Sequence, residues 1–314
     1  MTIRNRINLD FARDIDFSRI LTNPILDIAA RFWDEERYAA FRVCYRSMRR
    51  IDDLVDDRKE QVGPIAPDEA AHMQRIMGDW LEAVRHQLPG DDFQAEFLET
   101  VDRFRIPLWP WERLCRAMSY DLSHNGYRNF RGFLRYTEGA AISPASVFMH
   151  LCGVRVEARV CNPPVYDIRK GARDLAIFSY LVHIVRDFQK DHLRGLNYFS
   201  DDLLAEQSLS LTDLAAIART GRPTQPFRLL IRRYLYLAEY YRRRARATVD
   251  RLLPLLEPRY QLSLEIIYGL YLLTYQQIEP NRGNFASEDT NVLPEQLQAR
   301  IEQVVSAFVP QSPK

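Results

Sequence analysis

The chain has 314 residues, with 43 basic and 42 acidic side chains and a formal net charge of +1. Because the charges balance, the chain has no overall positive charge that would attract nucleic acid, so we expect no nucleic-acid partner. The four cysteines show no CxxC or Cys/His spacing typical of zinc sites or disulfide frameworks, which favours a reducing compartment. The N-terminus has no apolar segment of signal-peptide length, and no later run approaches the roughly 20 apolar residues of a spanning helix. We therefore expect a cytoplasmic protein that is soluble, or at most peripheral to a membrane.

The composition predicts helices throughout the chain. It contains only 12 glycines and is rich in leucine, alanine, arginine and glutamate. It shows neither alternating strand-like runs with hairpin turns nor an internal repeat. In the first half we expect helices over residues 24–59 (as one helix or two), 68–87, 91–104 and from the turn at 107–111 to 121. Asp68 is expected to cap the second of these regions.

Prolines and glycines divide the second half of the chain. Residues 133–150 are rich in small side chains, which suit either close helix packing or space for a ligand, and Pro144 predicts a kink or break there. Beyond them we expect a helix over residues 167–195 and a short one from the N-cap Ser210 to Gly221. Three more are expected over 226–252, 262–279 and 293–308, with a disordered tail after about residue 309.

Two acidic motifs occupy residues 49–57 and 183–198. Asp52 and Asp56 are four residues apart in the first, and Asp187 and Asp191 have the same spacing in the second. On a helix this spacing places both carboxylates on one face. Taken singly, either pair is typical of a solvated helix end. Facing each other, however, the pairs could share Mg²⁺ ions that neutralise a diphosphate, while nearby arginines take the charge that develops as it leaves.

The motifs resemble the two signatures of squalene/phytoene synthases. The similarity lies in Arg49-Arg-Ile-Asp-Asp-Leu-Val-Asp56 and in Ile184-Val-Arg-Asp-Phe-Gln-Lys-Asp191 followed by Arg194-Gly-Leu-Asn-Tyr198. Asp121 followed by Tyr136 resembles the central segment of the family, and residues 271–279 resemble its late tyrosine-containing helix. The resemblance implies one all-α domain over residues 1–314, with the isoprenoid-synthase (terpenoid-synthase) fold of a helical bundle around a central cavity. It also implies Mg²⁺-dependent head-to-head joining of two allylic prenyl diphosphates, farnesyl or geranylgeranyl, to a squalene- or phytoene-type product.

The resemblance further implies roles for the residues at matching positions. The metal ligands, for Mg²⁺ or alternatively Mn²⁺, would be Asp52, Asp53, Asp56, Asp187 and Asp191. Substrate would be bound by Arg49, Arg50, His183, Lys190, Arg194 and Tyr198. Catalytic roles would fall to Tyr136, Tyr271 and Arg186, although Tyr271 is equally typical of a core tyrosine. No nucleotide fingerprint is present, so NADPH use stays open, as do substrate chain length and oligomeric state.

Three segments depart from the family pattern. Tyr180 and His183 stand where the family usually has glutamine and asparagine, while residues 139–144 and 23–25 replace a glycine-rich segment and a Ser-Phe element. These changes lie where a second diphosphate and its chain would sit. A divergent member could therefore use different prenyl substrates, act on a single prenyl diphosphate or stop at the cyclopropyl intermediate, and a non-catalytic binding or assembly relative also stays open. The four intact aspartates count against the non-catalytic alternative.

A basic run, Arg242-Arg-Arg-Ala-Arg246, lies on the long amphipathic helix expected over residues 226–252. Such a run indicates either a solvated helix face, which is the more common case, or contact with anionic membrane lipid. Membrane lipid is therefore a second candidate partner beside the prenyl diphosphate.

Overall fold

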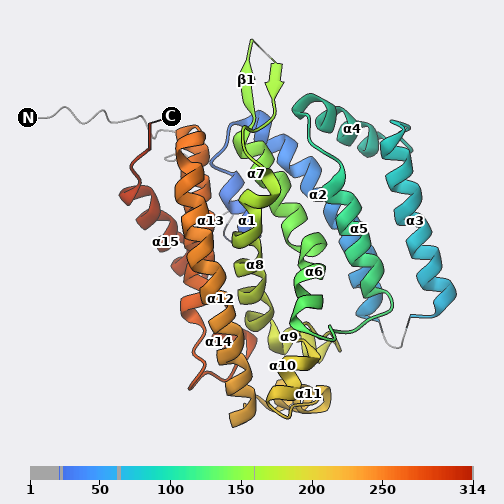
Figure 1. Cartoon of the computed structure of the whole chain (residues 1–314), viewed down its shortest axis with the longest axis vertical. Coiled ribbons are helices and arrows are strands. Elements are labelled where there is room, and N and C mark those ends of the chain that lie inside the picture. The colour runs from blue at the N-terminus through green and yellow to red at the C-terminus, as the bar shows by residue number, and fades with distance from the viewer. Residues whose placement is uncertain (1–20, 22–23, 62–64, 159, 313–314) are drawn as a thin grey trace, which may run out of the picture.

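Most of the described chain is helical (Figure 1). The computed structural model describes residues 21, 24–61, 65–158 and 160–312. The first seven helices are α1 (Ile25–Ala30), α2 (Glu35–Lys59), α3 (Pro67–Arg85), α4 (Asp92–Phe104), α5 (Trp109–Asp121), α6 (Phe130–Ala140) and α7 (Ile142–Gly153). The others are α8 (Ile168–Arg186), α9 (Phe188–Leu193), α10 (Asp201–Glu206), α11 (Leu211–Thr220), α12 (Gln225–Leu252), a 3₁₀ turn (Leu253–Leu255), α13 (Pro258–Gln277), α14 (Ser287–Thr290) and α15 (Pro294–Ala307). The all-α prediction is confirmed.

Short polar side chains fix where several helices begin. Asp34, Asp91 and Asn129 each accept a hydrogen bond from a backbone N–H in the first turn of α2, α4 and α6. Ser210 and Asp213 form the reciprocal capping box that starts α11, as predicted, and Gly221 ends that helix with a φ of 62°. Asp68 does not cap α3, because that helix begins one residue earlier, at Pro67. Proline suits this first position, where its missing N–H is not needed.

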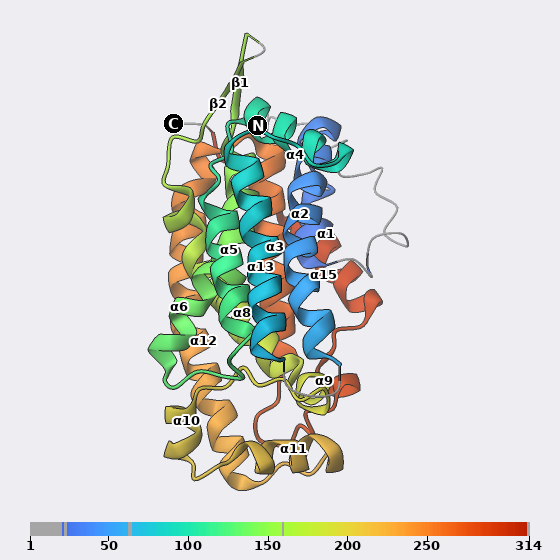
Figure 2. The same ribbon diagram turned by 90° about the vertical axis from the view of Figure 1, so that its right-hand side faces the viewer.

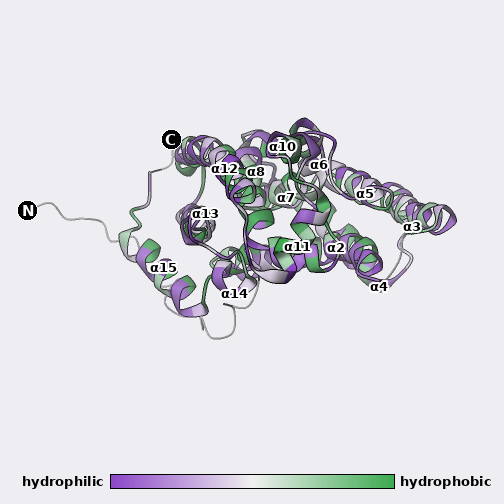
Figure 3. Cartoon of the chain, turned by 90° about the horizontal axis from the view of Figure 1, so that it is seen from below, coloured by the Kyte–Doolittle hydropathy of each residue, from purple (hydrophilic) through white to green (hydrophobic). Residues whose placement is uncertain are grey.

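The long helices run side by side along the long axis of the molecule (Figures 1 and 2). Helix α8 lies in the middle and packs against α7 and α12. Viewed along this axis, α3 and α4 lie on one side of the bundle and α15 on the other, with α7 and α8 between them (Figure 3). The short helices α10 and α11 gather at one end. The buried hydrophobic side chains from α1 to α15 form one connected cluster.

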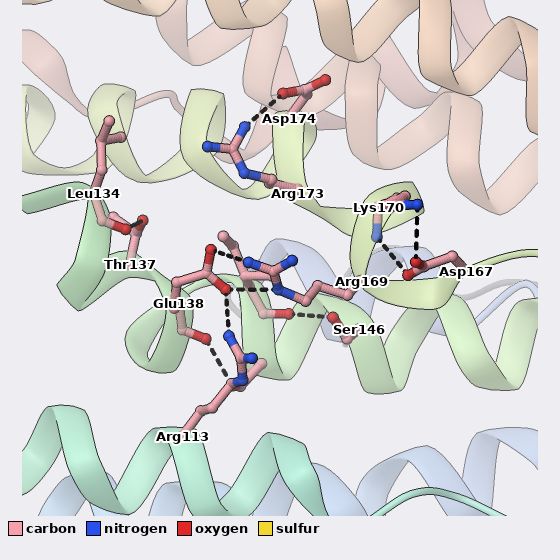
Figure 4. Close-up of polar contacts among 12 residues, drawn as sticks. Arg113, Leu134, Thr137, Glu138, Ser146, Asp167, Arg169, Lys170, Arg173 and Asp174 are labelled. Carbon is pink, nitrogen blue, oxygen red and sulfur yellow. Dashed lines mark hydrogen bonds and ion pairs between the residues drawn. The ribbon is translucent and has the colours of Figure 1, made fainter. Parts of the chain in front are cut away.

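An ion-pair network fastens three helices together beside this core (Figure 4). Glu138 on α6 accepts a hydrogen bond of 2.7 Å from Arg113 on α5. It also accepts two from Arg169 on α8, of 2.9 and 2.6 Å. Because both oxygens of one carboxylate are used, the network fixes the position of α6 relative to its two neighbours.

The small residues within 133–150 serve both close helix packing and the lining of a cavity. A Cβ atom added to Gly139 would lie 2.2 Å from the carbonyl oxygen of Arg113, so α5 and α6 are in backbone contact there. Ala140, Pro144 and their neighbours instead line a cavity. The predicted break occurs at Ala141, between α6 and α7, and Pro144 lies in the first turn of α7, where no intrahelical N–H bond is lost.

Two predictions about secondary structure are wrong. The helix expected over residues 167–195 is interrupted at Asp187, which separates α8 from α9. A small antiparallel hairpin was also missed, with β1 (Arg155–Glu157) paired to β2 (Val160–Asn162). It projects beyond one end of the bundle (Figures 1 and 2). Strands of three residues are too short to show the alternation by which a strand is recognised in a sequence.

The C-terminal tail is held in place as far as Gln311, contrary to the disorder expected after about residue 309. Its N–H donates to Gln261 Oε1 at 2.8 Å, and its carbonyl accepts from Gln261 Nε2 at 2.9 Å. Residues 313–314, on which the same prediction falls, lie outside the described residues. None of the described helices is long and apolar enough to cross a membrane.

The basic run of α12 is electrically compensated. Arg242 and Arg243 both bind Glu239. Arg244 pairs with Asp174 at 3.2 Å, and Arg246 pairs with Glu265 at 2.7 Å. Each of the four arginines therefore has an acidic partner, as on an ordinary solvated helix face.

Candidate functional site

Both acidic motifs face one large cavity in the middle of the bundle. Its volume is about 860 Å³, and its walls come from α1, α2, α5, α6, α7, α8, α9, α13 and α15. Thirteen of the fourteen predicted site residues line it: Arg49, Asp52, Asp53, Asp56, Tyr136, His183, Arg186, Asp187, Lys190, Asp191, Arg194, Tyr198 and Tyr271. The expectation that the chain holds two distant motifs face to face agrees with this geometry.

The first motif places carboxylates on the cavity side of α2. Burial, together with the neighbouring Asp56, raises the pKa of Asp52 to about 7. Burial and the charge of Asp121 raise the pKa of Asp56 to about 6. Arg49 donates 2.5 Å from Asp52 Oδ2 and also binds Asp53, so its single charge is shared between two carboxylates. The α2 wall therefore carries an excess of negative charge toward the cavity.

Arg50 is the one predicted site residue that does not line the cavity. Its guanidinium lies 4.0 Å from the ring centre of Phe93 and 3.4 Å from Asp91 Oδ2, at the start of α4. Successive helical residues are rotated by about 100°, so Arg50 leaves α2 in a different direction from Arg49.

The second motif spans the junction of α8 and α9. Asp187 is the residue between the two helices, yet the Asp191 N–H still bonds to its carbonyl at 2.9 Å. The pair thereby keeps the i to i+4 relation that the sequence predicted. Burial and the neighbouring Asp187 raise the pKa of Asp191 to about 7. Among the described residues, the Asp191 carboxylate has no hydrogen-bond or ion-pair partner.

Arg186 and His183 hold Asp187. Arg186 donates to Asp187 Oδ1 at 2.5 Å and to Oδ2 at 2.8 Å. The His183 Nε2 atom lies 3.3 Å from Asp187 Oδ2. Burial alone would raise the pKa of Asp187, but the Arg186 hydrogen bonds and the nearby His183 hold it below its usual value. Burial lowers the pKa of His183 to about 4, so its ring is neutral near pH 7.

Two cations of the α9 wall differ in their pairing. Lys190 lines the cavity and has no ion-pair partner among the residues that the structure describes. Arg194 forms an ion pair with Glu60, the C-cap residue of α2. Glu60 also lines the cavity and was not predicted. It lies four residues after Asp56, so extending the same helix face by one turn would have found it.

A cluster of tyrosines forms the wall between the motifs. The Tyr136 hydroxyl donates to Asp121 Oδ2 at 2.5 Å, and Lys59 Nζ lies 3.5 Å from Asp121 Oδ1. Lys59 and the link to Asp121 were also missed, because the pair joins α2 to α5 across the fold. The Tyr180 ring is 6.2 Å from that of Tyr136 and 6.3 Å from that of Tyr198. Tyr180 therefore fills space in the aromatic wall.

The rest of the cavity is apolar. Its lining includes Ile28, Leu114, Phe148, Met149 and Leu264, all of them buried. A cavity with charged groups at one side and a hydrocarbon lining elsewhere suits an amphiphilic ligand with an anionic head.

The charged wall fits divalent cations in part. Asp56 and Asp191 lack protein partners among the described residues, and Asp52 has one oxygen bonded, so three partly uncompensated carboxylates face the cavity. The described residues contain no preassembled group of three or more metal-ligating side chains. Mg²⁺ commonly takes one or two protein carboxylates and completes its shell with substrate phosphates and water. Oxygen ligands of this kind suit Mg²⁺ or Mn²⁺.

Comparison with known proteins agrees with this geometry. The profile of the squalene/phytoene synthase family matches residues 27–299. The curated relatives include "Phytoene synthase 1, chloroplastic" of Solanum lycopersicum, 28% identical over 66% of this chain and 47% of that protein. They also include "Phytoene synthase 3, chloroplastic" of Zea mays, 29% identical over 69% of this chain and 48% of that protein. The chain thus spans about half the length of these relatives.

Two solved structures have the same fold. A dehydrosqualene synthase in complex with ligand superposes with a TM-score of 0.71 and 17% identity, over 95% of both chains. The squalene synthase HpnC from Alicyclobacillus acidocaldarius superposes with a TM-score of 0.63 and 16% identity, over 98% of this chain and 95% of that one. The predicted fold class is therefore confirmed.

Proposed function

Because the chain belongs to the squalene/phytoene synthase family, we propose that it is a divalent-cation-dependent prenyltransferase that joins two allylic prenyl diphosphates head-to-head. One observation carries the proposal: two acidic motifs about 130 residues apart in the sequence share one cavity whose remaining lining is apolar. The proposed substrates are farnesyl or geranylgeranyl diphosphate, and the proposed cation is Mg²⁺, with Mn²⁺ as the alternative.

The charged residues would bind and orient the diphosphate. When bound, divalent cations on the carboxylates would neutralise its charge and make it a better leaving group. Lys190 and Arg186 face the same space and would take up the negative charge that develops on the departing oxygen. The Glu60–Arg194 ion pair would have to open before Arg194 could contribute.

The apolar and aromatic residues would protect the cationic intermediates. As the carbon–oxygen bond of one substrate breaks, its electron pair leaves with the diphosphate and an allylic cation remains. The alkene of the second substrate attacks this cation, and loss of a proton closes a cyclopropylcarbinyl diphosphate. The apolar lining would exclude water, and the rings of Tyr136 and Tyr271 line the cavity where they could stabilise positive charge. A second ionisation would end either in hydride transfer from NADPH or in loss of a proton.

Product analysis tests the proposal. The purified chain would be incubated with Mg²⁺ and farnesyl or geranylgeranyl diphosphate, with and without NADPH. We expect a hydrocarbon, or a cyclopropylcarbinyl diphosphate, with twice the carbon number of the substrate. A hydrocarbon with the carbon number of the substrate would instead show an enzyme that acts on a single diphosphate. If neither substrate releases diphosphate, the non-catalytic alternative is correct.

A further inference from the structure

Four neighbouring helices form one broad side of the bundle, away from the cavity. Helices α12, α8, α6 and α5 pack in that order, each against the next. Viewed along the long axis of the molecule, they follow one edge of the bundle (Figure 3). Eight arginines lie on the outer surface of these helices or directly before α6, and we call this surface the arginine face: Arg113, Arg116, Arg128, Arg131, Arg135, Arg169, Arg173 and Arg244.

Four arginines of this face have no protein partner. Arg116 lies on α5, Arg131 and Arg135 lie on α6, and Arg128 precedes that helix. All four side chains are exposed. Within the part of the chain that the structure describes, none of them forms a hydrogen bond, an ion pair or a ring contact. Their positive charges are therefore available to an anionic partner.

The contacts between α5 and α6 place these charges close together. Arg131 and Arg135 are one helical turn apart, and Glu138 follows on the same side of α6. Arg113 of α5 bonds to Glu138 at 2.7 Å, and Arg116 lies one turn farther along α5 on the same side. The single negative charge of Glu138 is already shared by Arg113 and a second arginine, on α8 (Figure 4). It cannot also neutralise the arginines beside it.

The α8 and α12 part of the face likewise has more arginines than carboxylates. Arg173 and Arg244 both pair with Asp174, at 3.3 and 3.2 Å, so one negative charge serves two cations. Two tyrosines accompany them on α12. Tyr240 is 54% exposed, with the Arg244 guanidinium 5.6 Å from its ring centre, and Tyr236, one turn earlier, is 68% exposed. Such side chains join an apolar ring to a polar tip, which suits the boundary between water and lipid.

The charge of this nearly neutral chain is thus distributed unevenly. At one end of the arginine face, Glu206 of α10 lies 3.9 Å from Arg233 and offsets part of the positive charge. On the other side of the bundle from α12, helices α3 and α4 carry more acidic than basic residues (Figure 3). Their acidic residues are Asp68, Glu69, Asp79, Glu82, Asp92, Glu96, Glu99 and Asp102, and their arginines are Arg75, Arg85 and Arg103. A negatively charged surface would therefore attract one side of the molecule and repel another.

We propose that the arginine face binds the anionic headgroups of a lipid bilayer, with the long axis of the bundle lying along the membrane surface. Guanidinium groups bind phosphate oxygens through paired N–H donors. Charge that is spread over four side-by-side helices matches an extended array of phosphates better than it matches one small anion. The rings of Tyr236 and Tyr240 would lie among the headgroups. This inference goes beyond the proposed function and does not depend on it, because binding to a bilayer requires no turnover.

Binding to vesicles tests the inference. The full chain would be sedimented with vesicles of phosphatidylcholine, with and without added phosphatidylglycerol. We expect binding to the anionic vesicles and not to the neutral ones, and this binding should weaken as salt screens the charges. Replacing both Arg131 and Arg135 with glutamine should weaken binding roughly 25-fold, since each basic residue close to an anionic surface strengthens binding about fivefold. Replacing Tyr236 and Tyr240 with serine should weaken it as well.

A matched pair of arginines provides the control. Arg75→Gln with Arg282→Gln removes the same charge from exposed positions outside the face, on α3 and in the segment after α13. Because all four arginines are exposed, both double variants should unfold at the temperature of the unaltered chain. Equal weakening of vesicle binding in the two double variants would overturn the inference, because net charge alone would then explain the attraction. Failure of the unaltered chain to bind anionic vesicles would overturn it too, as would binding of a duplex oligonucleotide in place of vesicles.

Discussion

Arg194, just after α9, forms an ion pair with Glu60, at the end of α2, and so links the two acidic motifs across the cavity. The side chains are 44% and 39% exposed, and a pair of this exposure is worth only about 0.2–1 kcal/mol. A doubly charged ligand could therefore displace Glu60 at little cost and take Arg194 as its own partner.

Replacing Glu60 should favour the anionic ligand. In Glu60→Gln the Arg194 guanidinium is no longer engaged by a carboxylate, so inorganic pyrophosphate should bind up to about fivefold more tightly, the equivalent of the ion-pair energy. Calorimetric titration of the full chain measures this. Glu69→Gln is the matched control, because Glu69 pairs with Arg58 and does not line the cavity. Weaker binding in Glu60→Gln than in the control would show that the pair supports the site instead of competing with its ligand.

Arg49 and Arg50 are adjacent in the first motif, and we expect one to affect ligand binding and the other to affect stability. Arg50→Ala removes a cation from the face of Phe93, so the free energy of unfolding should fall by about 0.5–1 kcal/mol while pyrophosphate binding stays unchanged. Arg49→Ala should weaken pyrophosphate binding, since it removes a cation from the cavity wall and leaves Asp52 and Asp53 without their shared partner. Urea unfolding and calorimetry, applied to both variants, give the comparison. Equal loss of pyrophosphate binding in the two variants would restore Arg50 to the site.

Two glycines test the close contact of α5 and α6. A Cβ atom at position 139 would lie 2.5 Å from the Cβ of Ala117 as well as against the Arg113 carbonyl, so Gly139→Ala should cost about 1–3 kcal/mol or more. Gly78 on α3 has nothing within 4 Å of the added atom, and Gly78→Ala should raise stability by about 0.5–1 kcal/mol because alanine is the better helix former. Chemical unfolding of both variants measures the difference. A stability loss of the same size at both positions would contradict the backbone contact.

His150 should contribute to loss of stability in acid. Burial lowers its pKa below the ordinary 6.5, against the opposing effect of its hydrogen bond to the Phe104 carbonyl. In acid the folded state thus binds fewer protons than the unfolded chain. The contribution of His150 to the free energy of unfolding is therefore complete above pH 6.5 and is lost as the pH falls toward the folded-state pKa. One such group changes the free energy of unfolding by at most about 1.4 kcal/mol per pH unit.

His150→Gln provides the comparison, because glutamine can still donate to the Phe104 carbonyl but does not titrate. The free energy of unfolding of both proteins would be measured from pH 7.5 to 5. The unaltered chain should lose more stability over this range than the variant does. If the free energies of unfolding of the two proteins fall in parallel with pH, His150 is not responsible for the loss of stability. Titration of the cavity carboxylates contributes to both proteins alike.

The residues of the cavity were largely predictable because the motif spacing repeats along a helix. Arg49, Asp52, Asp53 and Asp56 lie on one side of α2, and the sequence placed them correctly. The same periodicity, extended by one turn beyond Asp56, would also have found Glu60.

Other features depend on contacts that no local pattern contains. Lys59 meets Asp121 from another helix, and neither residue type indicates such a pair. The break at Asp187 is not marked by proline or glycine, although its φ of −90° and ψ of 8° leave the helical region. The engagement of both Asp187 oxygens requires side-chain positions, so the sequence could show four equivalent aspartates but not the difference between them.

If both motifs act together on two prenyl diphosphates, the ratio of diphosphate released to product formed shows it most directly. Diphosphate and product would be quantified in one incubation with Mg²⁺ and farnesyl or geranylgeranyl diphosphate, using Asp56→Asn as the inactive control. Head-to-head joining predicts two diphosphates per hydrocarbon of doubled carbon number, or one per cyclopropylcarbinyl diphosphate if the reaction stops there. One diphosphate per hydrocarbon of unchanged carbon number, or release that persists in Asp56→Asn, would contradict the account.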